Sequence, residues 1–595
     1  MALKPARLQW SDDGSLASLD YDDVYFQRGQ ALPESKYVFI ENNNLPARFR
    51  NLGKGESFRI CELGFGSGLN FLLTLKTFAE TGGAGRLFFT SIEKHPIPKD
   101  DLRKIHSFFN LPHAEELIDQ YPPMVEGFHH LNIGGARLML IFGDVADMLP
   151  EIKGEFDAWF LDGFTPSKNP DMWEEKLYPH IAARTAGGGT LATFSSAGHV
   201  RRGLKAAGFT VKKITGYGIK WNMTVATMAG AKKEYPRRKV AVIGGSIAGA
   251  ATAYALARRG HSPVIYEKKP DADTIGHPVA VVYPKLTVDP SPMCRYHIHA
   301  FLYARMVARH LKVPSWKECG VLHLDLDEDE RTRTQKLLQS GEYPEDFCKA
   351  GDGGMFQPIA GMIDPRDFRQ CLTRDIPVEY GHDIKSLAAE VTVIAAGTAA
   401  KNFAGLDWLP LQSVRGQMSL LKPTPHSQDL DHVICHDGFL TPPVKGLHGA
   451  GATFQKGSTD DSFHAEDDAE NLAKLNQHLP QFGFTADSVA GASWGFRATT
   501  PDKLPMAGPL PDYERCREDF ATLREGKEVI GAPTPLIPHV YLSTGFGAHG
   551  MTGALLAGEI IAAEISGDPC PVPASLLEHL LPERFIFRGL KRKTI

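Results

Sequence analysis

Two stretches of the chain show the same succession of apolar, small and helix-forming positions. Residues 58–73 (FRICELGFGSGLNFLL) and residues 239–260 (KVAVIGGSIAGAATAYALARRG) each start with a short apolar run, continue through closely spaced glycines and end in a helical pattern. A buried strand, a glycine turn and a helix in this order are typical of the opening βαβ unit of a nucleotide-binding domain. The residues after each turn differ, so we interpret the stretches as two separate sites and not as an internal repeat.

The first part of the chain alternates strand-like apolar runs with helical stretches. This alternation predicts an α/β fold with a mostly parallel sheet and helices on both faces. The predicted strands after the first glycine turn cover residues 86–93, 136–144, 156–163, 188–195 and 221–229.

A charged, proline-containing stretch at residues 229–238 (AGAKKEYPRR) separates the two parts of the chain. Linkers between domains commonly have this composition, so we place a domain boundary there and predict domains at residues 1–235 and 236–595. A chain of 595 residues is too long for a single core, which agrees with this division.

The composition is that of an ordinary globular protein, with 43% hydrophobic and 23% charged residues. No apolar run is long enough to span a bilayer, and the N-terminus lacks the apolar segment of a signal peptide. The eight cysteines are scattered, without a CxxC pair or histidines at ligand spacing. We therefore expect no membrane association, no metal site, no disulfide framework and a reducing, cytoplasmic setting.

The net charge of −5 does not by itself indicate nucleic-acid binding. Local basic clusters do occur, and each taken alone is most simply a solvated surface. Several lie near the middle of the chain, where they could line a groove for a phosphate-bearing substrate. The clusters are Arg201, Arg202 and Lys205; Lys212 and Lys213; Lys232 and Lys233; Arg237, Arg238 and Lys239; and Arg588, Lys591, Arg592 and Lys593.

The first glycine turn lets the backbone approach a ligand closely. Glu93 ends the next predicted strand, where an acid commonly binds ribose hydroxyls, and Asp144 ends a later strand, where an acid can accept from an adenine amino group. This order, without a phosphate-binding lysine, favours S-adenosylmethionine over a dinucleotide. The alternative is a structural turn followed by two strand-end acids. The candidate binding residues are Glu62, Gly64, Gly66, Gly68, Glu93 and Asp144.

Residues 156–173 (FDAWFLDGFTPSKNPDMW) place candidate catalytic chemistry at the end of a predicted strand. Asp162 stands at its carboxyl end, where ligands of open α/β sheets bind. An amine must lose a proton before it attacks a methyl sulfonium, and Asp162 could take that proton or orient the amine. The alternatives are a cap or turn role for Asp162 and core packing for Trp173, which follows Phe164 in the loop.

The second glycine turn matches a dinucleotide-binding turn, with Glu267 as the acid for the ribose. Gly244 and Gly249 are present, but Ser246 stands where a middle glycine is usual, and the adjacent Gly245 could share its role. The alternative is a turn of this type that no longer holds a nucleotide.

Later segments resemble those with which flavoproteins of the glutathione-reductase type contact FAD. Residues 391–400 (VTVIAAGTAA) predict an apolar strand that ends in Ala-Ala-Gly, at Gly397. Residues 541–562 predict a strand, a glycine loop and a helix whose N-terminus could stabilise a reduced flavin. Arg497 is a candidate for binding a substrate carboxylate, with an ordinary ion pair as the alternative. The glycines concerned are Gly397, Gly545, Gly547 and Gly550.

Together these motifs resemble a family of bifunctional bacterial enzymes, the tRNA 5-methylaminomethyl-2-thiouridine biosynthesis bifunctional proteins. The likeness implies an N-terminal Rossmann-like S-adenosylmethionine methyltransferase domain. It also implies a C-terminal FAD-binding Rossmann domain with an inserted antiparallel-sheet substrate domain, as in D-amino-acid oxidases. The motifs are ELGFGSGLNFL, FLDGFTPSKNPDMW and FSSAGHVRRGL in front, and VIGGSIAGA, VAVVYPKL, VRGQMSL, GFRATTPDKLPMAG and GFGAHGMTGALLAGE behind.

The resemblance implies two reactions at the wobble uridine of tRNA, uridine 34. The rear domain would use FAD to convert a carboxymethylaminomethyl group to aminomethyl, and the front domain would then methylate that amine with S-adenosylmethionine. In this interpretation Asp162 and Arg497 act on the substrate, while Phe164 and Trp173 stack on a base splayed out of the RNA.

Two features depart from the family pattern. Ser246 replaces a glycine, and Gly276, His277 and Pro278 stand where the family carries Ser-Gly-Asn. FAD affinity or the oxidase rate could therefore differ. The alternatives are an oxidase for free amino acids fused to a small-molecule methyltransferase, and a rear domain that is a flavin-free structural or RNA-docking module.

Overall fold

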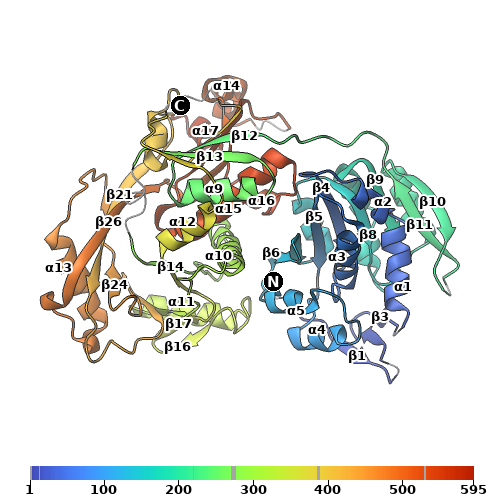
Figure 1. Ribbon diagram of the computed structural model, residues 1–595, viewed down its shortest axis with the longest axis horizontal. Coiled ribbons are helices and arrows are strands. Elements are labelled where there is room, and N and C mark those ends of the chain that lie inside the picture. The colour runs from blue at the N-terminus through green and yellow to red at the C-terminus, as the bar shows by residue number, and fades with distance from the viewer. Residues whose placement is uncertain are drawn as a thin grey trace. The chain divides into compact units, whose positions relative to one another are not determined.

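The computed structural model describes residues 3–12, 14–27, 29–218, 220–269, 277–384, 389–527 and 531–595. The chain divides into two compact units (Figure 1). One unit consists of Met1–Pro236 together with Ala563–Ala574, and the other of Arg237–Ala562 together with Ser575–Ile595.

An eight-stranded sheet forms the centre of the first unit, in the order β10-β11-β9-β8-β4-β5-β7-β6. Five consecutive strands, β9, β8, β4, β5 and β7, are parallel, and the three outer strands each pair antiparallel with their neighbour. The mostly parallel sheet predicted from the sequence is therefore confirmed. The strands are β4 (Ser57–Leu63), β5 (Arg86–Glu93), β6 (Gly127–Ile133), β7 (Ala136–Phe142), β8 (Phe156–Leu161), β9 (Thr185–Thr193), β10 (Thr210–Thr215) and β11 (Asn222–Thr227).

Both faces of this sheet are buried. Along β7, Leu138 and Leu140 belong to one hydrophobic core, whereas Met139 and Ile141 belong to a second. Successive side chains of a strand point to opposite faces, so each core covers one face. Helix α3 (Leu69–Thr81) contributes to the first core and α7 (Leu177–Ala183) to the second.

A segment from near the C-terminus completes the first unit. Arg59 on β4 forms a buried ion pair with Asp568, with Nε and Oδ1 3.1 Å apart, and also donates to the Ser566 carbonyl. A methyl group at Gly567 would collide with the Tyr235 ring. The sequence had assigned this segment to the second domain, because local patterns do not show which core a segment joins.

The second unit contains a six-stranded sheet in the order β19-β13-β12-β20-β28-β27. All its strands are parallel except the edge strand β27. The strands are β12 (Lys239–Ile243), β13 (Ser262–Glu267), β19 (Val378–Tyr380), β20 (Val391–Ile394), β27 (Met506–Pro511) and β28 (Leu536–Thr544); helix α9 (Ile247–Ala257) follows β12 and α15 (Gly550–Ser566) follows β28.

A nine-stranded, largely antiparallel sheet is inserted into this unit, as the fold class predicted. Helix α13 (Ala465–His478) packs beside strands β21 and β24 (Figure 1). The strands are β15 (Val321–Leu324), β16 (Lys349–Gly351), β17 (Gly354–Gln357), β21 (Gln412–Leu421), β22 (Val433–Cys435), β23 (Phe439–Leu440), β24 (His448–Gly451), β25 (Gln455–Lys456) and β26 (Val489–Thr499).

All eight cysteines are free thiols. Within the described ranges, none of the helices combines the length and apolar character that crossing a bilayer requires.

Candidate active sites

A cavity of about 560 Å³ opens in the first unit where β4, β5, β7 and β8 end. This volume falls in the usual range for small-molecule sites, and the carboxyl ends of parallel strands are where such ligands bind. The structure thus brings most of the sequence-predicted residues to one place. Those on its wall are Gly64, Gly66, Glu93, Asp144, Asp162 and Phe164.

Gly64 allows the ends of two neighbouring strands to approach each other closely. Its φ is +92°, and a Cβ there would lie 2.4 Å from the carbonyl oxygen of Asp162. Gly68, the N-cap residue directly before α3, has a φ of +76°, and a Cβ there would meet the Phe65 ring. Both positions therefore need glycine for backbone reasons, which explains the spacing seen in the sequence.

Glu93 holds the glycine loop in place. Its carboxylate accepts hydrogen bonds from the amides of Gly66 and His95, both at 2.8 Å. Burial raises the pKa of Glu93, and these amides oppose the rise. A carboxylate at this position, next to the cavity, can also accept hydroxyl protons from a ribose.

Asp144 lies at the cavity wall and caps helix α6 (Val145–Glu151), because its Oδ1 accepts from the Ala146 amide at 2.8 Å. Its Oδ2 pairs with the Lys94 ammonium at 2.7 Å. Burial alone would raise the pKa of Asp144, but Lys94 and the Ala146 amide outweigh burial and hold that pKa below its usual value. Asp144 is therefore an anion that can accept a further hydrogen bond.

A single amide links the two deepest carboxyl groups of the site. Asn70 Nδ2, on the first turn of α3, donates to Asp162 Oδ2 at 2.6 Å and to Glu62 Oε1 at 2.9 Å. Ser91 Oγ donates to Glu62 Oε2 at 2.7 Å, and Ser35 Oγ donates to the Asn70 side-chain oxygen. This network fixes the orientation of Asp162 toward the cavity that it lines.

The two carboxyl groups differ in how readily they ionise. Burial raises the pKa of Asp162 to about 6, although the Asn70 hydrogen bond and the Lys220 ammonium lower it. Burial and the nearby Asp162 hold the pKa of Glu62 well above its usual range. Asp162 is therefore poised to accept a proton near neutral pH, whereas Glu62 favours its neutral form.

Aromatic rings form one wall of this cavity. Phe164 lies 4.8 Å from Tyr21 and 4.9 Å from Tyr25 between ring centroids. Trp173, in contrast, is buried: its Nε1 donates to the Phe164 carbonyl at 2.8 Å and its ring packs on Phe194. The structure places Trp173 in the core and not on the cavity wall, which favours the core-packing alternative and a supporting role for the loop.

Several cavity residues were missed from the sequence. Asn70 could have been found from the sequence, because it follows the glycine turn two residues after Gly68. The others reach the cavity from distant segments without a motif of their own. These residues are Tyr21, Tyr25, Ser35, Lys94 and Lys220.

In the second unit, three glycine-containing loops meet at one edge of the six-stranded sheet. They follow β12, β20 and β28, which are adjacent and parallel, so their carboxyl ends share an edge. Thr544 Oγ1 donates to the Gly397 carbonyl at 3.0 Å, which joins the second loop to the third. The three predicted groups of glycines are therefore brought together.

The first of these loops is tight. A Cβ at Gly249 would lie 1.8 Å from the Gly244 carbonyl oxygen, and Gly244 itself has a φ of +108°. The Gly245 amide donates to Glu267 Oε2 at 2.6 Å, the same arrangement that Gly66 and Glu93 form in the first unit. Ser246 has a φ of −71°, so its backbone conformation does not require glycine.

Arg497, on β26, is a half-buried cation that lies against Gly416 of β21. A Cβ at Gly416 would lie 2.2 Å from its Nη1, so this glycine on β21 makes room for the guanidinium. Arg497 donates to the Thr453 carbonyl at 3.3 Å, and no acidic partner is recorded for it in the described part of the chain. Burial and Arg497 lower the pKa of His277 to about 4, and His277 contacts Ser493. Gly276 lies outside the described residues.

Three histidines gather around Tyr283 next to the loop that precedes α15. Tyr283 lies 4.7 Å from His323 and 5.9 Å from His549, and His549 lies 4.4 Å from His297, all between ring centroids. Burial is the main cause that lowers the pKa of His297 to about 3 and those of His323 and His549 to about 4. These imidazoles are therefore neutral at physiological pH. Sequence motifs contained Tyr283 and His549 but did not reveal the cluster.

Comparison with known proteins finds matches to both parts of the chain. A family model for S-adenosyl-L-methionine-dependent methyltransferases matches residues 111–229, and one for FAD dependent oxidoreductases matches residues 239–564. The tRNA 5-methylaminomethyl-2-thiouridine biosynthesis bifunctional protein MnmC of Aeromonas salmonicida (strain A449) is 35% identical over 658 aligned positions, which cover 99% of this chain and 98% of the relative. The chain belongs to this bifunctional family.

A second relative matches the whole chain, whereas the solved structures match only part of it. The family member of Stutzerimonas stutzeri (strain A1501) is 35% identical over 655 positions, covering 100% of this chain and 99% of the relative. Among solved structures, glycine oxidase from Geobacillus kaustophilus matches with a TM-score of 0.44 and 18% identity, over 56% of this chain and 95% of that one. Iminodiacetate oxidase (IdaA) from Chelativorans sp. BNC1 matches with a TM-score of 0.46 and 19% identity, over 58% and 98%.

Proposed function

We propose that this chain modifies the wobble uridine of tRNA, uridine 34, in two consecutive steps. The first step is the FAD-dependent removal of the carboxymethyl group from 5-carboxymethylaminomethyl(-2-thio)uridine, which gives 5-aminomethyl(-2-thio)uridine. The second is S-adenosylmethionine-dependent N-methylation to 5-methylaminomethyl(-2-thio)uridine. The observation that carries this proposal is the full-length match to the bifunctional family, with a methyltransferase segment followed by an FAD oxidoreductase segment. We assign the steps to residues 236–595 and 1–235, respectively.

For the methyl transfer, we assign Asp162 as the proton acceptor. The substrate amine must lose a proton so that its nitrogen lone pair can form a bond to the methyl carbon while the carbon–sulfur bond breaks. Asp162 is held in place by Asn70 and has a pKa of about 6, so it is ionised at neutral pH and can take that proton. Glu93 and Asp144 would bind the ribose and adenine of S-adenosylmethionine, and Phe164 would stack on the uracil.

For the oxidation, FAD, when bound, would supply the acceptor for a hydride from the C–H bond on the carbon between the amine and the carboxylate. Water would hydrolyse the resulting imine, which leaves the aminomethyl group on the uridine and releases the two carboxymethyl carbons as glyoxylate. The tight loop from Gly244 to Gly249 and the amide-bound Glu267 fit the pyrophosphate and ribose of a dinucleotide. Arg497 lacks a recorded acidic partner in the described residues, and its guanidinium suits a carboxylate such as the one on the carboxymethyl group. It would orient the substrate and distinguish it from the aminomethyl product.

Unpaired basic residues of the first unit support an RNA substrate. No ion pair with an acidic side chain is recorded, among the described residues, for the cations of α8 (Gly198–Ala206) and β10. Trp221, at the end of the turn that carries the cavity residues Tyr217 and Lys220, is 88% exposed. Exposed aromatic and basic side chains together bind single-stranded RNA by stacking and by phosphate contacts. The basic residues are Arg201, Arg202, Lys205, Lys212 and Lys213.

The deciding experiment compares electron donors. Purified protein is incubated with undermodified tRNA that carries carboxymethylaminomethyluridine, or with free glycine and its N-alkyl derivatives, and tRNA nucleosides are analysed by mass spectrometry with and without S-adenosylmethionine. We expect aminomethyluridine without S-adenosylmethionine and methylaminomethyluridine with it. Turnover of the free amines and none of the tRNA would instead establish a small-molecule oxidase.

A further inference from the structure

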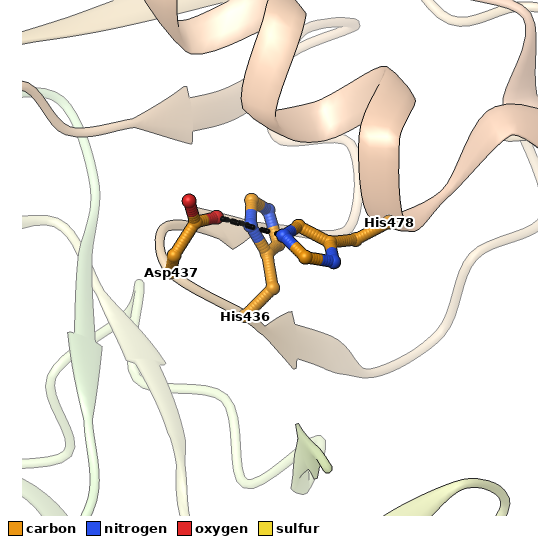
Figure 2. A group of neighbouring side chains, drawn as sticks. All are labelled: His436, Asp437 and His478. Atoms are coloured by element: carbon orange, nitrogen blue, oxygen red, sulfur yellow. Dashed lines mark hydrogen bonds and ion pairs between the residues drawn. The ribbon is translucent and has the colours of Figure 1, made fainter. Parts of the chain in front are cut away.

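Three potential metal ligands meet in the inserted sheet of the second unit, away from the glycine loops in sequence. His436 and Asp437 lie in the turn between β22 and β23, and His478 is the last residue of α13. Figure 2 shows the two imidazoles and the carboxylate turned toward one another, and one ligand atom from each lies within 4.8 Å of the other two. Two separate elements therefore supply a nitrogen, nitrogen and oxygen donor set.

Hydrogen bonds within the cluster leave one buried nitrogen unsatisfied. Asp437 Oδ1 is 2.7 Å from His436 Nδ1 and 3.4 Å from His478 Nε2. The His436 side chain is only 2% exposed, and its Nε2 is buried without a hydrogen-bond partner in the part of the chain that is described. A buried polar atom in this state is costly unless a water molecule or an ion satisfies it.

The charges around the cluster favour a cation. Asp437 contributes a carboxylate, and His478 stands at the C-terminal end of α13, where the free carbonyls of the helix carry partial negative charge. Lys474, one turn earlier on α13, is the neighbouring cation, but its ammonium is bound by Glu470 at 2.6 Å.

We propose that His436, Asp437 and His478 bind one divalent transition-metal ion of the zinc class. Imidazole nitrogens and a carboxylate oxygen suit Zn²⁺, Co²⁺ and Ni²⁺, whereas Mg²⁺ and Ca²⁺ prefer oxygen donors alone. With zinc bonds of about 2.0–2.2 Å in a tetrahedral site, ligand atoms lie roughly 3.3–3.6 Å apart. The 3.4 Å separation of Asp437 and His478 already fits, whereas the 2.7 Å contact between Asp437 and His436 must lengthen, which the half-exposed Asp437 allows. A water molecule would take the remaining position.

The sequence predicts no metal site, because it contains no CxxC pair and no cysteines with histidines at ligand spacing. The ligands here come from a turn and from a helix end that are distant in sequence, and only the packing of α13 brings them together. The middle of the same helix is already fixed to β21, where Ser419 donates to Asp468 at 2.5 Å and Asn471 donates to the Gln417 carbonyl at 3.1 Å. A metal ion would fix its C-terminal end as well.

By fixing the end of α13, the metal ion would support the inserted sheet, which carries Arg497, the proposed carboxylate-binding residue. β21 pairs along its length with β26, and Val414 stands opposite Arg497 in that pairing. The ion would thus have a structural role in the second unit, and its binding is independent of the proposed function.

The test uses tag-free, full-length protein that has been treated with EDTA and dialysed. Titration with Co²⁺ should give the intense visible absorption of a four- or five-coordinate site and saturate at one ion per chain, and Zn²⁺ should displace the colour. His478→Ala and Asp437→Asn should each abolish this absorption. His432→Ala is the matched control, because His432 forms an equivalent pair with Asp431 at 2.7 Å but no third ligand is recorded nearby within the described residues.

Flavin absorbance and the metal-free melting temperature of each variant check that it is folded. Zn²⁺ should raise the melting temperature of the wild type and of His432→Ala but not of the two ligand variants, because an ion that binds only the folded state stabilises it. Two results would overturn the proposal. One is the absence of Co²⁺ absorption in the wild type, which would mean that the three side chains only hydrogen-bond to one another and bind no metal ion. The other is unchanged absorption in both ligand variants.

Discussion

Asp162 illustrates how the local environment of one residue sets its chemistry. Burial raises its pKa to about 6 from an ordinary value near 4, so the carboxylate is protonated as pH falls through 6 and can no longer accept a proton from the amine. We expect single-turnover methyl transfer to fall about tenfold for each pH unit well below 6. Asp162→Asn should abolish methyl transfer at neutral pH, and any residual rate should no longer fall with pH below 6, which is the acidic limb of the pH–rate profile. A rate that stays level far below pH 6 would exclude Asp162 as the base.

Asn70 should shift that profile without acting on the substrate. Its amide donates to Asp162 and lowers the pKa of that carboxyl, so Asn70→Ala should raise the pKa. We expect the acidic limb of the methyl-transfer profile to move to higher pH, with a lower rate at neutral pH. Asn51→Ala, at an exposed position beyond the cavity-lining residues, serves as the control. An unshifted limb in Asn70→Ala would contradict the proposed network.

Arg497 should matter only for the oxidation step. Replacing a charge-assisted hydrogen bond to a carboxylate costs about 2 kcal/mol, so Arg497→Ala should lower kcat/KM for carboxymethylaminomethyl-tRNA about 30-fold. Methylation of aminomethyl-tRNA should be unchanged. The exposed Arg333→Ala is a suitable control. Equal loss of both activities would indicate a general effect on tRNA binding.

Residue positions that depend on backbone geometry were the easiest to predict from the sequence. The glycines at 64, 68, 244 and 249 are required by close backbone approaches or positive φ, which leave a clear local pattern. Tyr21 and Lys220 were missed because their nearness to Asp162 arises from tertiary packing. Trp173 was placed on the substrate side because an aromatic residue in a site loop looks the same whether it faces the core or the cavity.

At the scale of elements, apolar runs located the parallel strands well. The run at residues 86–93 coincides with β5, and those at 136–144 and 156–163 contain β7 and β8. Strands buried on both faces are apolar throughout, so their limits show in the sequence. Pairing partners do not show: β26 lies beside β21, although many residues separate them.

Helix α13 allows a quantitative test of an element's attachment. Asp467, nearly fully buried, forms an ion pair with the buried Arg415 of β21 and also accepts from Gln455 at 2.8 Å. Asp467→Ala would leave the Arg415 guanidinium buried without its counter-ion, so we expect the second unit to lose about 3 kcal/mol of stability toward urea. Glu466→Ala, on the exposed side of the same helix turn, should change stability by less than about 0.5 kcal/mol. Similar losses in both variants would contradict a specific role for this ion pair.

For the whole molecule, the two sites should be separable by mutation. A methyl group at Gly249 would lie 1.8 Å from the Gly244 carbonyl oxygen, so Gly249→Ala should distort the dinucleotide turn. We expect a protein without flavin absorbance that no longer oxidises carboxymethylaminomethyl-tRNA but still methylates aminomethyl-tRNA. Gly491→Ala, where the added methyl meets only ordinary contacts, should remain yellow. A yellow Gly249→Ala protein would mean that FAD does not use this turn.

The return of residues Ala563–Ala574 to the first unit has a consequence for synthesis on the ribosome. The buried Arg59 lies near the start of the chain, whereas its counter-ion Asp568 is translated only after the whole inserted sheet. At roughly 5–20 residues per second, this interval lasts of the order of tens of seconds. Until residues 563–574 have been synthesised and have left the exit tunnel, Arg59 of the nascent methyltransferase unit therefore has no carboxylate partner at this position. Residues 1–236 expressed separately would lack Asp568 and therefore the counter-ion of Arg59.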